Sequence, residues 1–184
     1  MKKIAVVILM MLVAAGVNAQ EKYFTRSGKV SFSSKTDMEN IEATNTKGTS
    51  VMDTKTGQVE FAVLMKAFEF EKELMMEHFN ENYVESDKYP KATFKGSITD
   101  ISSVNFQKDG AYPVKLKGQL TFHGVTNDIT PDGTIEIKGG KPTGKTSITI
   151  LLADYKIVIP NVVKDNISKS VKIDIIAAYE KMSL

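Results

Sequence analysis

Apolar and polar side chains alternate along most of the chain after residue 20. The alternation is clearest in AYPVKLKGQLTF, residues 111–122, and in SVKIDIIAAYE, residues 170–180, where one face is apolar and the other largely polar or charged. A period of two is the period of a β-strand that buries one face. About eight or nine such segments, joined by short turns, predict an antiparallel all-β fold in which one face of the sheet is buried.

The segment EFEKELMMEHFNENYVESDKYP, residues 69–90, breaks this alternation. Met75, Phe79 and Tyr83 recur at four-residue steps, which is helical spacing, and Pro90 disfavours helix at the residue before it. We therefore expect a single helix around residues 72–82. The chain otherwise lacks the helical crossovers of a parallel sheet, and its many evenly spaced strands favour a closed barrel or a sandwich.

The first nineteen residues have a different pattern. Lys2 and Lys3 precede an apolar run that ends at Val17, and Val17-Asn18-Ala19 has the form of a cleavage site. The run has about fourteen residues, whereas a membrane-spanning helix needs about twenty, so a retained anchor is the less favoured alternative. We predict a signal peptide over residues 1–19, a periplasmic or secreted mature protein, and one domain over residues 20–184.

Charge and cysteine content narrow the function classes. The chain has 24 basic and 22 acidic residues, and loss of Lys2 and Lys3 leaves the two signs balanced. A neutral domain gives no indication of nucleic-acid binding. The absence of cysteine excludes disulfides, thiol chemistry, cysteine-metal sites and a lipoprotein anchor.

The segment GGKPTGKT, Gly139 to Thr146, matches the phosphate-binding loop pattern by its letters. That loop requires a helix directly after its lysine, so that helix and loop amides face the phosphates. Here the β-branched, alternating run TSITILLAD follows, which predicts a strand. We interpret the match as a hairpin turn and expect no nucleotide.

His78 and His123 are the only histidines. They have no zinc-motif spacing, and no nucleophile-elbow pattern accompanies them, so we predict no metal, no cofactor and no catalytic residues. We expect His123 to end a strand and to bond to nearby backbone before a turn over Val125 to Asp128. A hydrolase or isomerase that uses His78 or His123 with a carboxylate is the enzymatic alternative.

Soft apolar residues gather near the predicted helix. They are Met65, Met75 and Met76 together with Phe61, Phe68, Phe70 and Phe79. The flexible methionine side chain can pack against apolar ligands of irregular shape, although it also fills ordinary protein cores. The cluster is therefore consistent with a cavity wall or with a packed core.

Three blocks resemble the YceI-like polyisoprenoid-binding family. They are ESDKYPKATFKG (residues 85–96), LTFHGVTNDIT (120–130) and ADYKIVIPNVVKDNISKSVKIDI (153–175), and the similarity extends from about Tyr23 to Glu180. The resemblance implies an eight-stranded antiparallel lipocalin-like barrel, exported by a bacterium, that holds a long isoprenoid or related amphiphile. It implies no enzymatic activity, although His78 and His123 fall at positions where the family commonly has histidine.

We therefore expect an exported, non-catalytic carrier or storage protein, with envelope stress as one setting for it. Its ligand would be an isoprenoid, a quinone or a fatty amphiphile, and homodimer formation is left open. The alternative is a fully packed barrel that serves as a structural or interaction module of the cell envelope. The expected cavity residues are Phe61, Val63, Met65, Phe68, Phe70, Met75, Phe79, Phe94, Ile98, Leu116, Leu120, Phe122, Ile135, Ile150 and Leu152.

Overall fold

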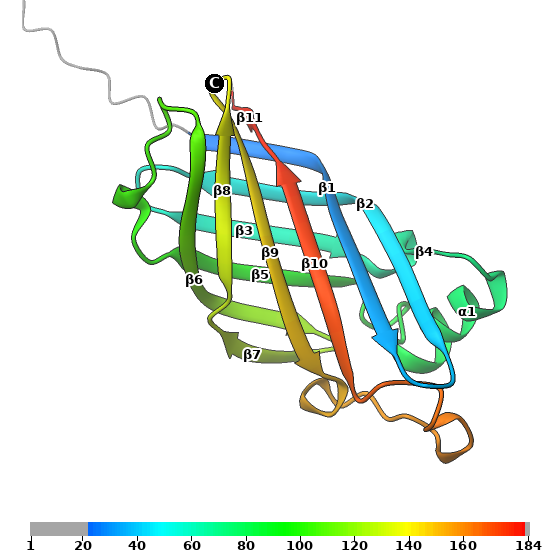
Figure 1. The fold of residues 1–184 in the computed structure, drawn as a ribbon. Helices are drawn as coiled ribbons and strands as arrows, with labels where there is room; N and C mark the ends of the chain where they lie inside the picture. The colour runs from blue at the N-terminus through cyan, green and yellow to red at the C-terminus, as the bar shows by residue number, and fades with distance from the viewer. Residues whose placement is uncertain (1–21, 183–184) are drawn as a thin grey trace, which may run out of the picture.

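The computed structural model describes residues 22–182, which form one sheet of eleven strands and a short helical segment (Figure 1). The predicted signal peptide, residues 1–19, lies outside the described residues. The strands are β1 (Lys22–Lys35), β2 (Asn40–Asp53), β3 (Gln58–Leu64), β4 (Glu69–Phe70), β5 (Lys91–Ile98), β6 (Gly110–Phe122), β7 (Val125–Ile129), β8 (Asp132–Lys138), β9 (Lys141–Leu151), β10 (Ser170–Ala178) and β11 (Glu180–Lys181).

Eight of these strands close into an antiparallel barrel. Their order is β1-β2-β3-β5-β6-β8-β9-β10, and β10 pairs with β1 to complete the ring. Short β4, β7 and β11 pair with β2, β6 and β1 and account for the excess over the predicted eight or nine strands. The structure confirms the predicted eight-stranded barrel.

Tight two-residue turns connect β6 to β7 and β8 to β9. His123 and Gly124 have φ of 49° and 72°, and Gly139 and Gly140 have φ of 57° and 72°. Positive φ at both central residues is the requirement of a two-residue hairpin turn that matches strand twist. The phosphate-loop pattern therefore contains the β8–β9 turn, as predicted, but the turn is limited to Gly139–Gly140. The strand begins earlier than expected, because β9 already starts at Lys141 within the pattern.

The turn expected over Val125 to Asp128 is wrong, because those residues belong to β7. The chain reverses earlier, at His123–Gly124, and Val125 pairs with Phe122 immediately afterwards. Asparagine and aspartate are uncommon in strands, but alternate residues of β7 are exposed, Asp128 among them.

The wall of the barrel is interrupted where β6 changes partner, and we call this interruption the seam. β6 pairs with β8 over residues 110–115 and then with β7 over residues 118–122. Within residues 22–182 no strand pairing joins β7 to β9. Side chains fill the seam instead, since buried Tyr155 and Ile157 pack with Val125, Ile129 and Ile150.

The predicted helix is present. α1 spans Glu73–His78 and continues as a π-helical turn, η2 (Phe79–Tyr83). It lies at the same end of the barrel as the β1–β2 hairpin and the loop of residues 152–169, as Figure 1 shows. We call this end the mouth.

The opposite end of the barrel is filled by side chains. Tyr23 stacks on Phe106 with ring centroids 6.2 Å apart, within a core that includes Met52 and Ile137. There the hydroxyl of buried Tyr179 lies 2.8 Å from Ser50 Oγ. Ser50 Oγ donates to Glu60 O at 2.7 Å, so Tyr179 is the donor to Ser50.

The Tyr179→Phe substitution tests how much the Tyr179–Ser50 hydrogen bond stabilises the filled end of the barrel. Loss of the buried hydrogen bond should lower the free energy of unfolding at pH 7 by about 1 kcal/mol. Burial also raises the pKa of Tyr179, so the unfolded state ionises first. The stability that this residue contributes is complete below pH ~10 and is lost as the pH rises further.

Urea unfolding between pH 7 and 11 measures both effects. The wild-type free energy of unfolding should fall above pH ~10, and that of Tyr179→Phe should fall less steeply. Tyr112→Phe is the matched control, because the Tyr112 hydroxyl donates to Lys108 O at 2.9 Å in an exposed position. The prediction would be contradicted if the free energy of unfolding fell equally steeply with pH above ~10 in the wild type and in Tyr179→Phe.

Candidate functional site

An apolar cavity runs through the barrel from the filled end to the mouth. Its volume is about 440 Å³, within the range of ligand pockets, and strands on every side of the barrel contribute to its wall. All fifteen residues that the sequence predicted for the cavity line it. Their contact with a ligand remains a prediction.

The lining extends beyond the predicted set, mostly through residues that follow the same alternation. Val30 and Phe32 on β1 and Val171, Ile173 and Ile175 on β10 point inward. Their period-two spacing is visible in the sequence and is sufficient to find them. The polar contributors from the mouth, Ser34, Glu39, His78 and Asn166, have no such signal.

Glycines keep the lumen open beside two phenylalanines. A Cβ on Gly48 would lie 2.7 Å from the Phe61 ring, and a Cβ on Gly28 would lie 3.0 Å from it. The Phe94 ring covers Gly96 and its cross-strand partner Gly118 in the same way, at 2.6 and 2.8 Å. Both rings therefore lie along the wall, in the space that inward side chains would otherwise take.

Three mouth segments surround the opening: residues 35–40, residues 71–84 and residues 152–169. Each contributes to the cavity lining, through Glu39 from the first, Met75 and Phe79 from the second, and Val163 and Asn166 from the third. The opening is therefore formed by loops and a helix that the barrel strands hold in place.

An aromatic cluster attaches the helical segment to the barrel. The ring of Phe79 lies 5.5 Å from that of Phe32, 5.7 Å from that of Phe68 and 5.1 Å from that of Phe70. Aromatic pairs at these centroid distances each contribute about 0.5–1.5 kcal/mol beyond their buried area. Phe79 therefore fixes the segment over the mouth.

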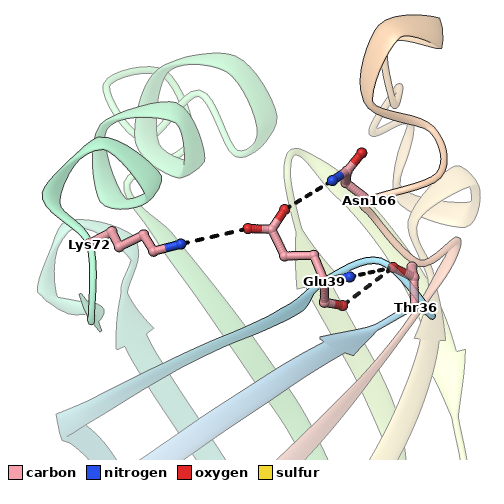
Figure 2. Close-up of polar contacts among 4 residues, drawn as sticks. All are labelled: Thr36, Glu39, Lys72 and Asn166. Atoms are coloured by element: carbon pink, nitrogen blue, oxygen red, sulfur yellow. Dashed lines mark hydrogen bonds and ion pairs between the residues drawn. The ribbon is translucent and has the colours of Figure 1, made fainter.

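Glu39 links the three mouth segments, as Figure 2 shows. Thr36 closes the hairpin turn, where its backbone N–H donates to Glu39 O at 2.9 Å and its hydroxyl accepts from the Glu39 amide at 3.1 Å. The Glu39 carboxylate then accepts from Asn166 Nδ2 at 3.3 Å and lies 3.9 Å from Lys72 Nζ. One side chain thus joins the hairpin, the helical segment and the loop.

His123 is outside the cavity lining and supports the seam. Its Nδ1 lies 2.8 Å from Tyr155 O, and its Nε2 lies 2.8 Å from Glu85 Oε2. Tyr89 packs edge-on at 4.7 Å. Both polar partners are acceptors, so the two hydrogen bonds form together only when both ring nitrogens carry hydrogen. His123 therefore ties the β6–β7 turn to residues 85–89 and to the turn at Tyr155.

One pKa shift, the placement of metal-ligand side chains and the length of the helices complete the description of the site. Burial raises the pKa of Tyr83, which lines the cavity. In residues 22–182 no group of three histidines or carboxylates is placed to hold a metal ion. The same residues include no helix of the length and apolarity that a membrane crossing requires.

A closed eight-stranded barrel around an apolar cavity defines a lipocalin-like binding fold. The family model of the YceI-like domain matches residues 22–178, and the chain belongs to this family. A search of the curated proteins found no match.

Solved structures share the fold at low sequence identity. A polyisoprenoid binding domain from Saccharophagus degradans, implicated in plant cell wall breakdown, has 14% identity and a TM-score of 0.76, with 88% of this chain and 98% of that chain covered. BcnA from Burkholderia cenocepacia has 18% identity and a TM-score of 0.67, covering 82% and 95%. The YCEI protein of Campylobacter jejuni has 16% identity and a TM-score of 0.53, with both chains covered completely.

We predict that His123→Ala lowers stability more than ligand affinity. The substitution leaves Tyr155 O and the Glu85 carboxylate without this partner and places alanine at a positive φ. The free energy of unfolding should fall by about 2 kcal/mol, which corresponds to a melting temperature lower by roughly 4–8 °C. Thermal denaturation followed by circular dichroism measures the shift.

Two further variants separate the loss of the His123 ring contacts from the strain of alanine at positive φ, and from the loss of a histidine in general. His123→Asn tolerates positive φ and removes only the ring contacts, so it should retain most of the stability loss. His78→Ala removes the exposed histidine at the mouth and should leave the melting temperature within about 1 °C. Full loss of ligand binding by His123→Ala at an unchanged melting temperature would refute the structural role.

Proposed function

We propose that this protein is an exported, non-catalytic carrier or storage protein that holds one long apolar tail in its barrel. The observation that carries the proposal is the continuous apolar cavity, which opens at the mouth. An isoprenoid chain is the favoured ligand, since the matched domain from Saccharophagus degradans is described as polyisoprenoid binding. Quinones and fatty amphiphiles have tails of the same character.

Burial of the tail is sufficient for binding without a charged clamp. At roughly 0.8 kcal/mol per buried CH₂, a five-carbon isoprene unit contributes up to about 4 kcal/mol. Ordering the tail and restricting its motion cost several kcal/mol. Two or three buried units therefore support a Kd of about 1 μM or below.

The cavity volume favours this proposal over a packed structural barrel. A volume of about 440 Å³ corresponds to on the order of fifteen water molecules at ~30 Å³ each. A wall of apolar side chains offers such waters few hydrogen bonds, so an apolar occupant is the better match.

The arrangement of the histidines favours binding over catalysis. His78 lines the mouth, whereas His123 is engaged by Tyr155 and Glu85 outside the cavity lining. An acid-base reaction on a bound ligand needs its groups within hydrogen-bond reach of the reacting atoms. The two histidines do not converge on the cavity, so the proposal includes no reaction.

Mass spectrometry under native conditions, on protein purified from its own host, tests the proposal most directly. We expect a co-purifying lipid whose mass identifies the tail and the head group. Recovery of the empty protein, together with no uptake of added prenols, would overturn the carrier function.

The helical segment should control entry of the tail. Met75 and Phe79 line the cavity, so Met75→Asp with Phe79→Asp places two carboxylates at its opening. We expect prenol affinity to fall at least about tenfold, since uncompensated charges would be desolvated by the ligand. Isothermal titration calorimetry measures the affinity.

A matched variant adds the same charge on the outer face of this segment. Leu74 and Asn82 are exposed, so Leu74→Asp with Asn82→Asp should leave prenol affinity unchanged in solution. Unchanged uptake by the Met75 and Phe79 variant, with its fold retained, would show that the segment has no part in entry.

A further inference from the structure

Exposed aliphatic side chains project from all three mouth segments. Met38 on the hairpin is 73% exposed, Leu74 on α1 is 60% exposed, and Val158 and Val162 on the loop are 78% and 90% exposed. We call these four side chains the rim. Each stands beside residues that line the cavity, so the apolar rim and the apolar cavity share one end of the barrel.

This exposure is concentrated at the mouth. Eight large apolar side chains are exposed in residues 22–182, and four of them form the rim. Leu64 and Leu151 are the last residues of β3 and β9, which run toward the mouth. Only Val51 and Ile176 lie within strands away from it, at 38% and 41% exposure. Scattered apolar residues need no explanation, but a set gathered around one opening indicates an interaction surface.

We propose that the rim docks the protein, mouth first, on the surface of a lipid bilayer. The inference rests on the proposed function, because a cargo with a long apolar tail resides in bilayers and its transfer through water is costly. Insertion of four aliphatic tips removes their area from water and brings the cavity opening against the acyl chains. The tail can then pass between bilayer and cavity while it remains in apolar surroundings.

The charge at the mouth specifies the kind of bilayer. Residues 71–84 carry four glutamates and one lysine, whereas residues 35–40 and 152–169 together carry four acidic and four basic residues. The docking face is therefore net negative. An anionic lipid surface repels such a face within a Debye length, so docking depends on apolar insertion and favours a zwitterionic surface.

Vesicle flotation tests the docking surface. The mature protein is mixed with phosphatidylcholine vesicles, alone or with added phosphatidylglycerol, and the bound fraction gives a partition coefficient. The rim variant carries Met38→Ser, Leu74→Ser, Val158→Ser and Val162→Ser. The control carries Val51→Ser and Ile176→Ser, which remove exposed apolar side chains from the barrel wall.

We expect the wild type to bind phosphatidylcholine vesicles and the rim variant to bind at least about tenfold more weakly. The control should bind within about twofold of the wild type, and phosphatidylglycerol should weaken binding by the wild type. Val162→Ser alone, at the most exposed position, should give a smaller loss and provides the test if the full rim variant does not fold.

A second measurement keeps this inference separate from the proposed function. Binding of a short fluorescent prenol in solution reports on the cavity alone, and the rim variant should retain it. The docking proposal is wrong if the wild type binds the prenol but does not bind the vesicles. It is also wrong if the rim and control variants bind the vesicles equally. In both cases the proposed carrier function is unaffected. Binding that requires phosphatidylglycerol would also overturn the docking proposal. If the prenol does not bind to the wild type, the carrier function itself fails.

Discussion

The structure depends on the closure of eight strands into a ring through the β1–β2 and β1–β10 pairings. Closure pairs the two ends of the sheet, so that unpaired edges remain at the seam, and directs alternate side chains of each strand toward a common axis. Most residues that line the interior are apolar, and the polar ones include Thr93, Thr134 and Lys145 on the wall as well as those at the mouth. Whether such an interior is solid or hollow is then a matter of side-chain size. Tyr23, Phe106 and Tyr179 fill one end, whereas glycines opposite Phe61 and Phe94 leave space in the middle.

The mouth is held by interactions of unequal strength. The helical segment is attached through aromatic packing of Phe79, and such pairs remain effective in salt. The loop of residues 152–169 is attached through polar contacts, among them the amide of Ser168 on Ser34 Oγ at 2.9 Å. The ion pair of Glu39 with Lys72 is long and partly exposed, so it adds little stability. The aromatic cluster therefore holds the helical segment, and the polar contacts of Glu39 and Ser34 hold the loop of residues 152–169 against the hairpin.

Alternation was sufficient to predict the barrel strands and the part of the cavity lining that lies on them, because inward direction in a strand follows from residue parity. The segment that interrupts the alternation was predicted as a helix because its apolar residues recur at four-residue steps. The reversal at His123–Gly124 was misplaced because Asn127 and Asp128 resemble turn residues, although they belong to β7. The link from Glu39 to Asn166 joins residues 127 positions apart, and the bond from His123 to Tyr155 crosses the seam. Such pairings follow from tertiary arrangement, which local spacing does not encode.

The seam gives the barrel one compliant side. Where neighbouring strands are paired continuously, as β9 and β10 are, widening the wall would break a row of backbone hydrogen bonds at once. Between β7 and β9 the wall consists of packed side chains, with Asn127 Nδ2 donating to Asp154 O at 3.0 Å as an additional tie. Side chains can shift rotamers independently of one another, so this part of the wall adjusts in small steps. Local repacking at the seam can therefore change the shape of the wall there without breaking the strand pairings on either side of it.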